Sequence, residues 1–460
     1  MSEDYKSDML SPNTFEHDKF ALKPFCEKLE QFAIIDHDFA EGSLVVALTS
    51  PFGTGKSTFL RMWKHDLDRR RIVNPETPEA VILNAWQLDY CEAPLFAILA
   101  KLIKAIPKAE EGKIATVREA ASDFANFAIS IANDISSKVG LDAMKAGEHA
   151  KKKKQERQQK PDFLKMFEER TDAYDRLKEA LKEAFGGDSP KAFIFVDELD
   201  RCRPDYAIHY LETIKHVFYI HGLVFVLSID YDHLQSSARS LFGQELVFPE
   251  YLRKFVQRTF KLPAISAEGY EKLSHFYVER FIEIVGKRAC MMKLGGFADR
   301  AQELVAGFRM NPRQIQEALR TMGHVLSGTE EKRGMLYWCL GASTILLSIL
   351  KTKWPLVYES ISKDTQDHMT LGKILLEALP KDDAEWWFRL YLSGAASSNE
   401  GSKQIEKTLR EINMLPPDKA YNEREEFGRF AGEWGHWFAS SERSRLAAVC
   451  DKIENAARFS

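Results

Sequence analysis

The residues with the clearest chemical signal form one short loop, Ser50-Pro51-Phe52-Gly53-Thr54-Gly55-Lys56-Ser57-Thr58. Glycines let backbone N–H groups approach an anion closely, and a helix that follows directs its positive end at the same point. The pattern G-x-x-x-x-G-K-[ST] is met except at its first place, where Ser50 stands for glycine. In this pattern the lysine reaches the β- and γ-phosphates of a nucleotide, and the next hydroxyl ligates Mg²⁺. The loop therefore predicts a site for ATP and Mg²⁺, with Lys56 and Ser57 in these two roles.

Two adjacent carboxylates, Asp197 and Glu198, end the apolar stretch that begins at Phe193. Parallel sheets place ligands at the carboxyl ends of their strands. We therefore expect Asp197 to hold Mg²⁺, directly or through water, and Glu198 to be the base that polarises the attacking water. Taken alone, the segment would be a solvated acidic loop; together with the phosphate loop it predicts hydrolysis. The next pair, Asp200 and Arg201, is either a local ion pair or a nucleotide contact.

A third carboxylate, Asp230, follows another apolar stretch, residues 223–229. A polar group at this position is expected to sense the γ-phosphate or to position water, and Ser228 is a weaker candidate. The alternative is that Asp230 caps the helix that begins near Tyr231.

These residues need a parallel sheet to bring them together, and the sequence predicts one. Short apolar runs rich in β-branched residues indicate buried strands, and helical spacing of apolar residues lies between them. A strand, a helix and a strand of this length form a crossover unit, which favours parallel pairing. We predict strands over 43–49, 80–84, 192–196 and 223–229, with helices over 22–35, 58–67 and 206–219 and another from Pro94.

The composition is that of an average globular protein, with 45% hydrophobic residues and a net charge of −4. The six cysteines are scattered, which argues against a disulfide scaffold and favours a cytoplasmic compartment. The uncharged run between Arg333 and Lys351 is shorter than the roughly 20 residues of a membrane span, so we predict a buried helix there. The basic run Lys151–Lys160 is interpreted as a solvated linker, although binding of nucleic acid there stays open.

The order of several motifs resembles the KAP family of P-loop NTPases, a group related to the AAA+ and STAND classes. The resemblance covers about residues 18 to 352. Its motifs after the loop are Asn84-Ala85-Trp86, residues 197–202, Ser228-Ile229-Asp230, Tyr251-Leu252-Arg253-Lys254 running to Leu262-Pro263, and Asn311-Pro312-Arg313. Family members often carry Trp where Phe52 stands and a second Asp where Glu198 stands; both changes keep the chemistry. We expect the segment Asn84–Trp86 to pack an insertion against the sheet, without a catalytic role.

The resemblance implies an α/β fold: a parallel-sheet P-loop NTPase core with a helical insertion and a C-terminal all-helical region. The expected parts are a core of residues 1–103 and 191–263, an insertion of 104–190, a helical lid of 264–352 and a C-terminal region of 353–460. It also implies a basic residue that reaches a γ-phosphate, with Arg253, Lys254 and Arg258 as candidates on one face of a helix. Arg313 resembles a sensor arginine of the lid. A solvated helix face and a first helical turn are the respective alternatives.

The function implied by this resemblance is ATP binding and hydrolysis that drives a conformational switch. Bacterial relatives often lie in anti-phage defence or plasmid-exclusion loci, so we expect a defence ATPase that acts with an effector encoded nearby. An arginine that acts across a subunit boundary would require a homo-oligomer. Two alternatives stay open: a nucleotide-dependent scaffold, signalling or assembly protein with little hydrolysis, and a DNA-dependent ATPase, for which no helicase-type motif set is present.

Overall fold

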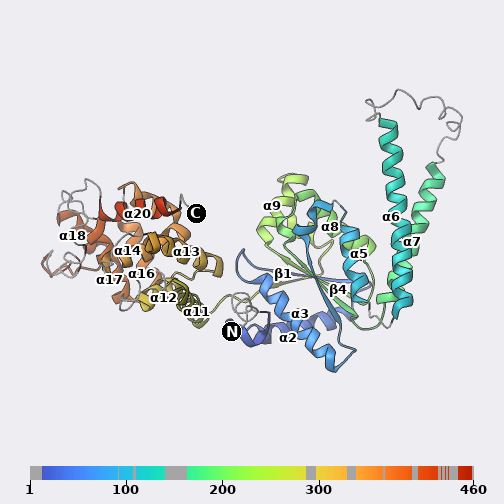
Figure 1. Cartoon of the computed structure of the whole chain (residues 1–460), viewed down its shortest axis with the longest axis horizontal. Helices are drawn as coiled ribbons and strands as arrows, with labels where there is room; N and C mark the ends of the chain where they lie inside the picture. The colour runs from blue at the N-terminus through green and yellow to red at the C-terminus, as the bar shows by residue number, and fades with distance from the viewer. Residues whose placement is uncertain are drawn as a thin grey trace. The chain divides into compact units, whose positions relative to one another are not determined.

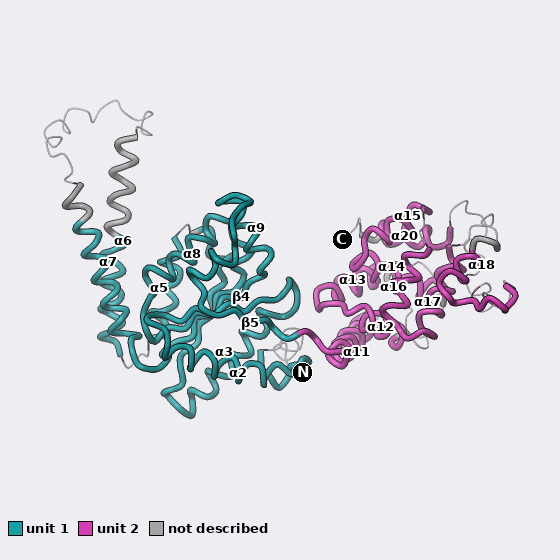
Figure 2. The backbone as a smooth tube through the Cα atoms, turned by 180° about the vertical axis from the view of Figure 1, so that it is seen from behind, with its two compact units in different colours: residues 1–263 teal, residues 264–460 magenta. Residues whose placement is uncertain are grey.

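The computed structural model divides into two compact units, Met1–Pro263 and Ala264–Ser460, which Figure 2 draws in different colours. Each unit buries its own set of apolar side chains. The described residues are 13–91, 93–106, 110–139, 163–285, 297–328, 338–365, 368–395, 402–422, 444–457 and the single positions 426, 430 and 434.

A five-stranded parallel sheet in the order β2-β3-β4-β1-β5 forms the centre of the first unit. Its strands are β1 (Leu44–Thr49), β2 (Glu79–Asn84), β3 (Ala192–Asp197), β4 (Leu223–Ile229) and β5 (Arg258–Lys261). The first four lie where the apolar runs predict them, and β3 and β4 are buried along their whole length. Continuous apolar strands need helices on both faces of the sheet. The predicted α/β class with a parallel sheet is therefore confirmed.

Helices cover the two faces of this sheet, as Figure 1 shows. Because side chains alternate along a strand, Val46 and Val226 pack on one face and Ala47 and Leu227 on the other. The first face carries α2 (Lys23–Asp38) and α3 (Lys56–Val73), with the fully buried Trp63 against Phe193 and Phe195 of β3. The second carries α5 (Pro94–Ala105), α8 (Pro204–Val217) and α9 (Tyr231–Phe242).

Between β2 and β3 the chain forms a pair of long helices, α6 (Glu111–Val139) and α7 (Phe163–Phe185), which lie side by side in Figure 1. They occupy the stretch expected as a helical insertion, and the basic run Lys151–Lys160 lies outside the described residues. Short elements complete the first unit: η1 (Phe15–His17), α4 (Ala85–Leu88), η2 (Asp89–Cys91), η4 (Leu199–Arg201) and α10 (Phe248–Leu252).

The second unit is helical throughout its described part. Its helices are α11 (Ala267–Val285), α12 (Phe297–Gly307), α13 (Pro312–Gly328), α14 (Trp338–Lys353), α15 (Pro355–Ser362), α16 (His368–Ala378), α17 (Lys381–Ala395), α18 (Ser402–Glu411) and α20 (Arg445–Ala457). The uncharged run forms α14, which is buried from Cys339 to Leu350, so the predicted core helix is confirmed. None of the helices in the described ranges has the length and hydropathy needed to cross a membrane.

One predicted element is wrong: the helix expected to carry Arg253, Lys254 and Arg258 together. Helix α10 ends at Leu252, and Arg258 begins strand β5. The backbone N–H of Gln257 donates to Val45 O at 2.9 Å, which starts the pairing of this segment with β1. As an edge strand with mostly exposed side chains, β5 lacks the apolar run that revealed the other strands.

Candidate functional site

The phosphate loop joins the end of β1 to the first turn of α3. Gly53 and Gly55 have φ values of 82° and 100°, in the left-handed region that favours glycine, whereas Ser50 does not have a positive φ. Ser50 contributes its side chain instead: its Oγ lies 2.6 Å from Thr54 Oγ1, which donates to Pro51 O at 2.8 Å. The irregular first position of the motif thus ties the loop to itself through hydroxyl groups.

Lys56 lies buried at the start of α3, and the charges of three acidic side chains act on it. Its Nζ donates to Ser50 O at 2.5 Å and to Pro51 O at 3.2 Å. Burial lowers the pKa of Lys56, and the charges of Asp200, Asp230 and Asp197 oppose this effect, in that order of strength. A lysine with this balance of burial and acidic neighbours is suited to bind phosphate oxygens, which would take the place of the loop carbonyls.

Asp197 and Glu198 stand at the end of β3, and the chain turns sharply between them. Asp197 is buried, and its Oδ1 accepts from the backbone N–H of Glu198 at 3.0 Å. Glu198 has φ 60° and ψ 28°, a left-handed conformation that costs a residue with a side chain about 1–3 kcal/mol. Strain of this kind persists where the surrounding contacts hold it.

Both carboxylate oxygens of Glu198 have a partner. Asn84 Nδ2 donates to Oε2 at 2.9 Å, and an Arg201 guanidinium nitrogen lies 3.1 Å from Oε1. Asn84 ends β2 and faces Asp197 in the strand register, while its Oδ1 accepts from Gln87 N at 2.9 Å and so caps α4. The interpretation of Asn84 as a packing residue missed this contact. The feature of the sequence that could have indicated this contact is the position of Asn84, a polar residue at the end of the strand beside β3.

The structure separates the pair Asp200 and Arg201, which the sequence left open. Arg201 pairs with Glu198, whereas Asp200 is buried beside Lys56. Burial raises the pKa of Asp200, and the positive charge of Lys56 opposes that rise. Asp200 is therefore one of the carboxylates whose charge acts on Lys56, and a nucleotide contact by Asp200 stays a prediction.

Asp230 follows β4, the strand that lies between β1 and β3. Its Oδ1 accepts from His233 N at 3.5 Å, so it caps α9 as the alternative interpretation expected. The charge of Asp230 also acts on Lys56. The predicted role of Asp230 at the γ-phosphate stays a prediction. Ser228 is fully buried, and its Oγ is a buried oxygen without a hydrogen-bond partner among the described residues.

The candidate arginines belong to three different segments of the chain. Arg253 caps the carboxyl end of α10, and Arg258 pairs with Asp36 at 2.8 Å. In the register Arg258 faces Val46, whereas the phosphate loop begins after Thr49, so Arg258 lies towards the other end of its strand. Arg313 belongs to the second unit, in the first turn of α13, where Asn311 Oδ1 accepts from Gln314 N at 3.0 Å. The three predicted arginine roles stay predictions.

Residues 24–328 match the KAP family P-loop domain, well over half of the chain. The chain belongs to this family. No curated protein matches the KAP-family chain at a significant level.

Two solved structures from Aeropyrum pernix align along nearly the whole KAP-family chain. The ORC2 protein in its ADPNP–ADP complexes has a TM-score of 0.34 and 11% identity, with 98% of each chain covered. The ORC1 protein in complex with DNA has a TM-score of 0.31 and 15% identity, with 94% of each chain covered. TM-scores this low do not support an argument about the fold. The fold of the KAP-family chain is therefore described from its own sheet.

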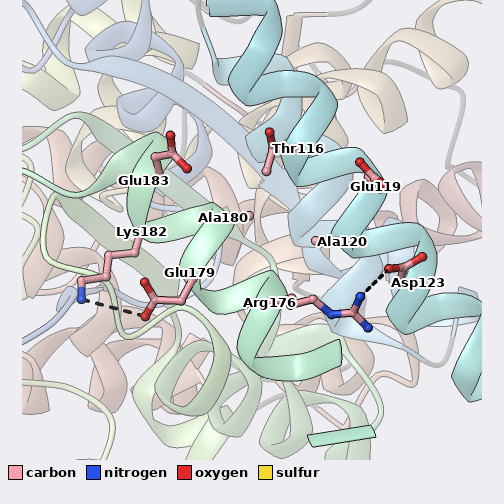
Figure 3. Close-up of a pocket in the computed structure, with 9 residues that line it drawn as sticks. All are labelled: Thr116, Glu119, Ala120, Asp123, Arg176, Glu179, Ala180, Lys182 and Glu183. Atoms are coloured by element: carbon pink, nitrogen blue, oxygen red, sulfur yellow. Dashed lines mark ion pairs between the residues drawn. The ribbon is translucent and has the colours of Figure 1, made fainter. Parts of the chain in front are cut away.

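A groove of about 680 Å³ lies between α6 and α7 of the KAP-family chain (Figure 3). Four of its charged side chains pair with each other: Arg176 pairs with Asp123 at 3.3 Å, and Lys182 lies 4.0 Å from Glu179. The residues that line it include no glycine or histidine. The groove therefore lacks the features that bind a nucleotide at the phosphate loop.

Proposed function

We propose that this KAP-family chain binds ATP with Mg²⁺ and hydrolyses the bond between the β- and γ-phosphates. The observation that carries the proposal is the buried Lys56 at the start of α3, with Asp197, Asp200 and Asp230 around it. A lysine in this position balances phosphate charge, and the glycines of the loop give backbone N–H groups access to the same anion. The residues proposed to contact ATP are Pro51, Phe52, Gly53, Thr54, Gly55, Lys56, Ser57 and Thr58.

Ser57 and Asp197 are the residues proposed to hold Mg²⁺. Ser57 lies in the first turn of α3, and Asp197 is a buried carboxylate that uses Oδ1 for a backbone hydrogen bond. The described residues contain no cluster of three ligands that would hold a metal alone, so phosphate oxygens and water would supply the remaining ligands. Bound Mg²⁺ would neutralise charge that develops on the phosphates. Glu198 is the proposed base, and Asp230 is proposed to sense the γ-phosphate.

The test compares ATP binding and turnover in the wild type, Lys56→Ala and Glu198→Gln. We expect Lys56→Ala to lose binding of a fluorescent ATP analogue, because the phosphates lose their buried cation. Glu198→Gln keeps its size and should bind ATP while turnover falls by about 100-fold or more, the usual range for a general base. A wild-type chain that fails to bind ATP would refute the site. Equal turnover in the wild type and Glu198→Gln would refute hydrolysis through Glu198.

A nucleotide-dependent scaffold with little hydrolysis is the second candidate, because Asn84 and Arg201 engage both oxygens of Glu198. The same comparison separates the two functions. A negligible wild-type rate that Glu198→Gln does not change, with ATP still bound, would favour the scaffold.

The wider role we propose is a conformational switch in bacterial anti-phage defence, in the cytoplasm, with a separate effector encoded nearby and a homo-oligomeric assembly. Its support is membership of the KAP family together with the resemblance of the motifs. Arg253, Arg258 and Arg313 are the residues proposed to contact the γ-phosphate, from the same or a neighbouring chain. Phage infection of cells that carry the wild-type locus or its Lys56→Ala form tests this role, and equal protection by both would contradict it.

A further inference from the structure

Arg201 is held between two aromatic rings that both reach the surface. The centre of its guanidinium lies 4.5 Å from the ring of Phe52 and 5.7 Å from the ring of Trp86. Phe52 belongs to the phosphate loop and Trp86 to α4, and their exposed fractions are 48% and 52%. Both distances fall within the roughly 6 Å at which a cation is attracted to an aromatic face. A single side chain thus connects the phosphate loop, the segment after β2 and Glu198.

Further contacts join the segment after β2 to the segment after β3. Arg203 pairs with Asp89 through its side chain at 3.0 Å and through its backbone N–H at 3.0 Å. Tyr206 donates its hydroxyl to Leu88 O at 3.3 Å. Because Arg203 pairs with Asp89, these contacts join the two segments through a different carboxylate from Glu198. Arg201 is the member of this network that brings a positive charge to Glu198.

This charge has a direct consequence for a base. The Arg201 and Glu198 side chains are only 26% and 16% exposed, so water screens their attraction incompletely. The guanidinium lies 3.1 Å from Oε1 and so occupies one of the two oxygens that would orient the attacking water. The ion pair therefore competes with water for this oxygen of Glu198.

We infer that Arg201 is a positioning residue that restrains Glu198, and that Phe52 and Trp86 form the clamp that keeps it there. Because Phe52 is part of the phosphate loop, a change in that loop on ATP binding alters the clamp, and an anionic γ-phosphate competes with Glu198 for the guanidinium. Release of Arg201 then leaves Glu198 able to accept a proton from water. The inference rests on the proposed function, since it concerns the same hydrolytic step.

The test is the steady-state turnover of ATP by Arg201→Met, which keeps the length of the side chain and removes its charge. We expect kcat to rise about fivefold, the factor that ~1 kcal/mol of ion pairing corresponds to, with KM unchanged. Trp86→Leu, which removes one face of the clamp, should raise kcat by a smaller factor, and the double variant should not exceed Arg201→Met. In a Glu198→Gln background, Arg201→Met should have no effect.

Arg203→Met is the matched control, because it removes from the same segment a guanidinium that pairs with Asp89. It should not raise kcat. An equal rise in Arg203→Met would mean that loosening the segment is the cause and would overturn the restraint. An unchanged or lower kcat in both Arg201→Met and Trp86→Leu would also overturn it. These outcomes differ from failure of the proposed function, in which the wild type does not bind ATP or Glu198→Gln does not change its turnover.

Discussion

Asn84 offers the sharpest test of how the candidate base is oriented. Its side chain has two separate partners: Oδ1 accepts from Gln87 N, which caps α4, and Nδ2 donates to Glu198 Oε2. Asn84→Asp has nearly the same shape and keeps an oxygen for the cap. It replaces the N–H donor by a carboxylate oxygen, which faces Glu198 at the position where the 2.9 Å hydrogen bond was made. The substitution thus removes one contact and leaves the other.

The expected magnitude follows from that single contact. A hydrogen bond to a charged group contributes about 1.5–3 kcal/mol, so its loss at the transition state lowers kcat by roughly 10- to 150-fold. Two carboxylates at this separation cannot both ionise freely, so the pair retains one proton to a higher pH. A base must be unprotonated to work, so the rising limb of the kcat profile moves to higher pH in the variant. The affinity for ATP should stay near the wild-type value, because the side-chain hydrogen bonds of Asn84 are made with Gln87 and Glu198.

The assay is ATP turnover from pH 5.5 to 9, together with the affinity for a fluorescent ATP analogue. Asn84→Ser is the matched control, since serine caps helices as well as asparagine but is too short to reach Glu198. It should lower kcat without the shift of the pH profile. A kcat within twofold of the wild type in both variants would refute the view that Asn84 orients Glu198. A fall in ATP affinity equal to the fall in kcat would place Asn84 in nucleotide binding instead.

Three further predictions concern burial. Asp200 has a raised pKa, so the folded state binds its proton more tightly than the unfolded state and stability falls as pH rises through the folded pKa. In urea unfolding, the free energy of unfolding of Asp200→Asn should therefore exceed that of the wild type most at neutral pH. A difference between the two that stays constant down to pH 4 would contradict this. His37 has a pKa lowered by burial and by the stacked His221, and its Nε2 accepts from Gly222 N at 2.9 Å. The contribution of His37 to stability is present above the ordinary histidine pKa and is lost as pH falls through the folded pKa. His37→Gln should therefore reduce the fall of Tm with acid. Equal slopes of Tm against pH in the variant and the wild type would count against this. Burial raises the pKa of Cys202 to about 12, so iodoacetamide at pH 8 should label it only after unfolding, and rapid labelling of the native chain would disprove its burial.

The parts of this fold that the sequence predicts are those with a local physical signal. Strands β1, β3 and β4 are apolar along their length because helices cover both of their faces, so short β-branched runs reveal them. The phosphate loop can be predicted because a left-handed backbone at positions 53 and 55 favours glycine, and both positions are glycine. Ser50 shows the limit of the pattern, since its hydroxyl contact with Thr54 is visible only in three dimensions.

The features that the sequence does not predict depend on neighbours that are distant along the chain. Asn84 and Glu198 are brought together because β2 and β3 are adjacent in the sheet, and strand order cannot be read from either segment. Strand β5 pairs with β1 across more than 200 positions, and its exposed side chains give no apolar pattern. The partner of Arg201 is hidden for a different, local reason: its nearest acidic neighbour in sequence is Asp200, but with the left-handed turn at Glu198 the guanidinium pairs with Glu198, three residues away.

The contacts of Lys56 and Arg201 point to one property of the site. Lys56 donates to carbonyl groups of its own loop, and Arg201 pairs with the carboxylate that would act as base. An anion at the loop attracts both cations, because backbone N–H groups and the α3 dipole hold it within reach of each. Moving Lys56 from its carbonyls to phosphate strengthens binding, whereas moving Arg201 from Glu198 changes what the carboxylate can do. In the proposed mechanism, ATP binding and activation of the base are thus coupled through two different side chains, so a variant that loses one need not lose the other.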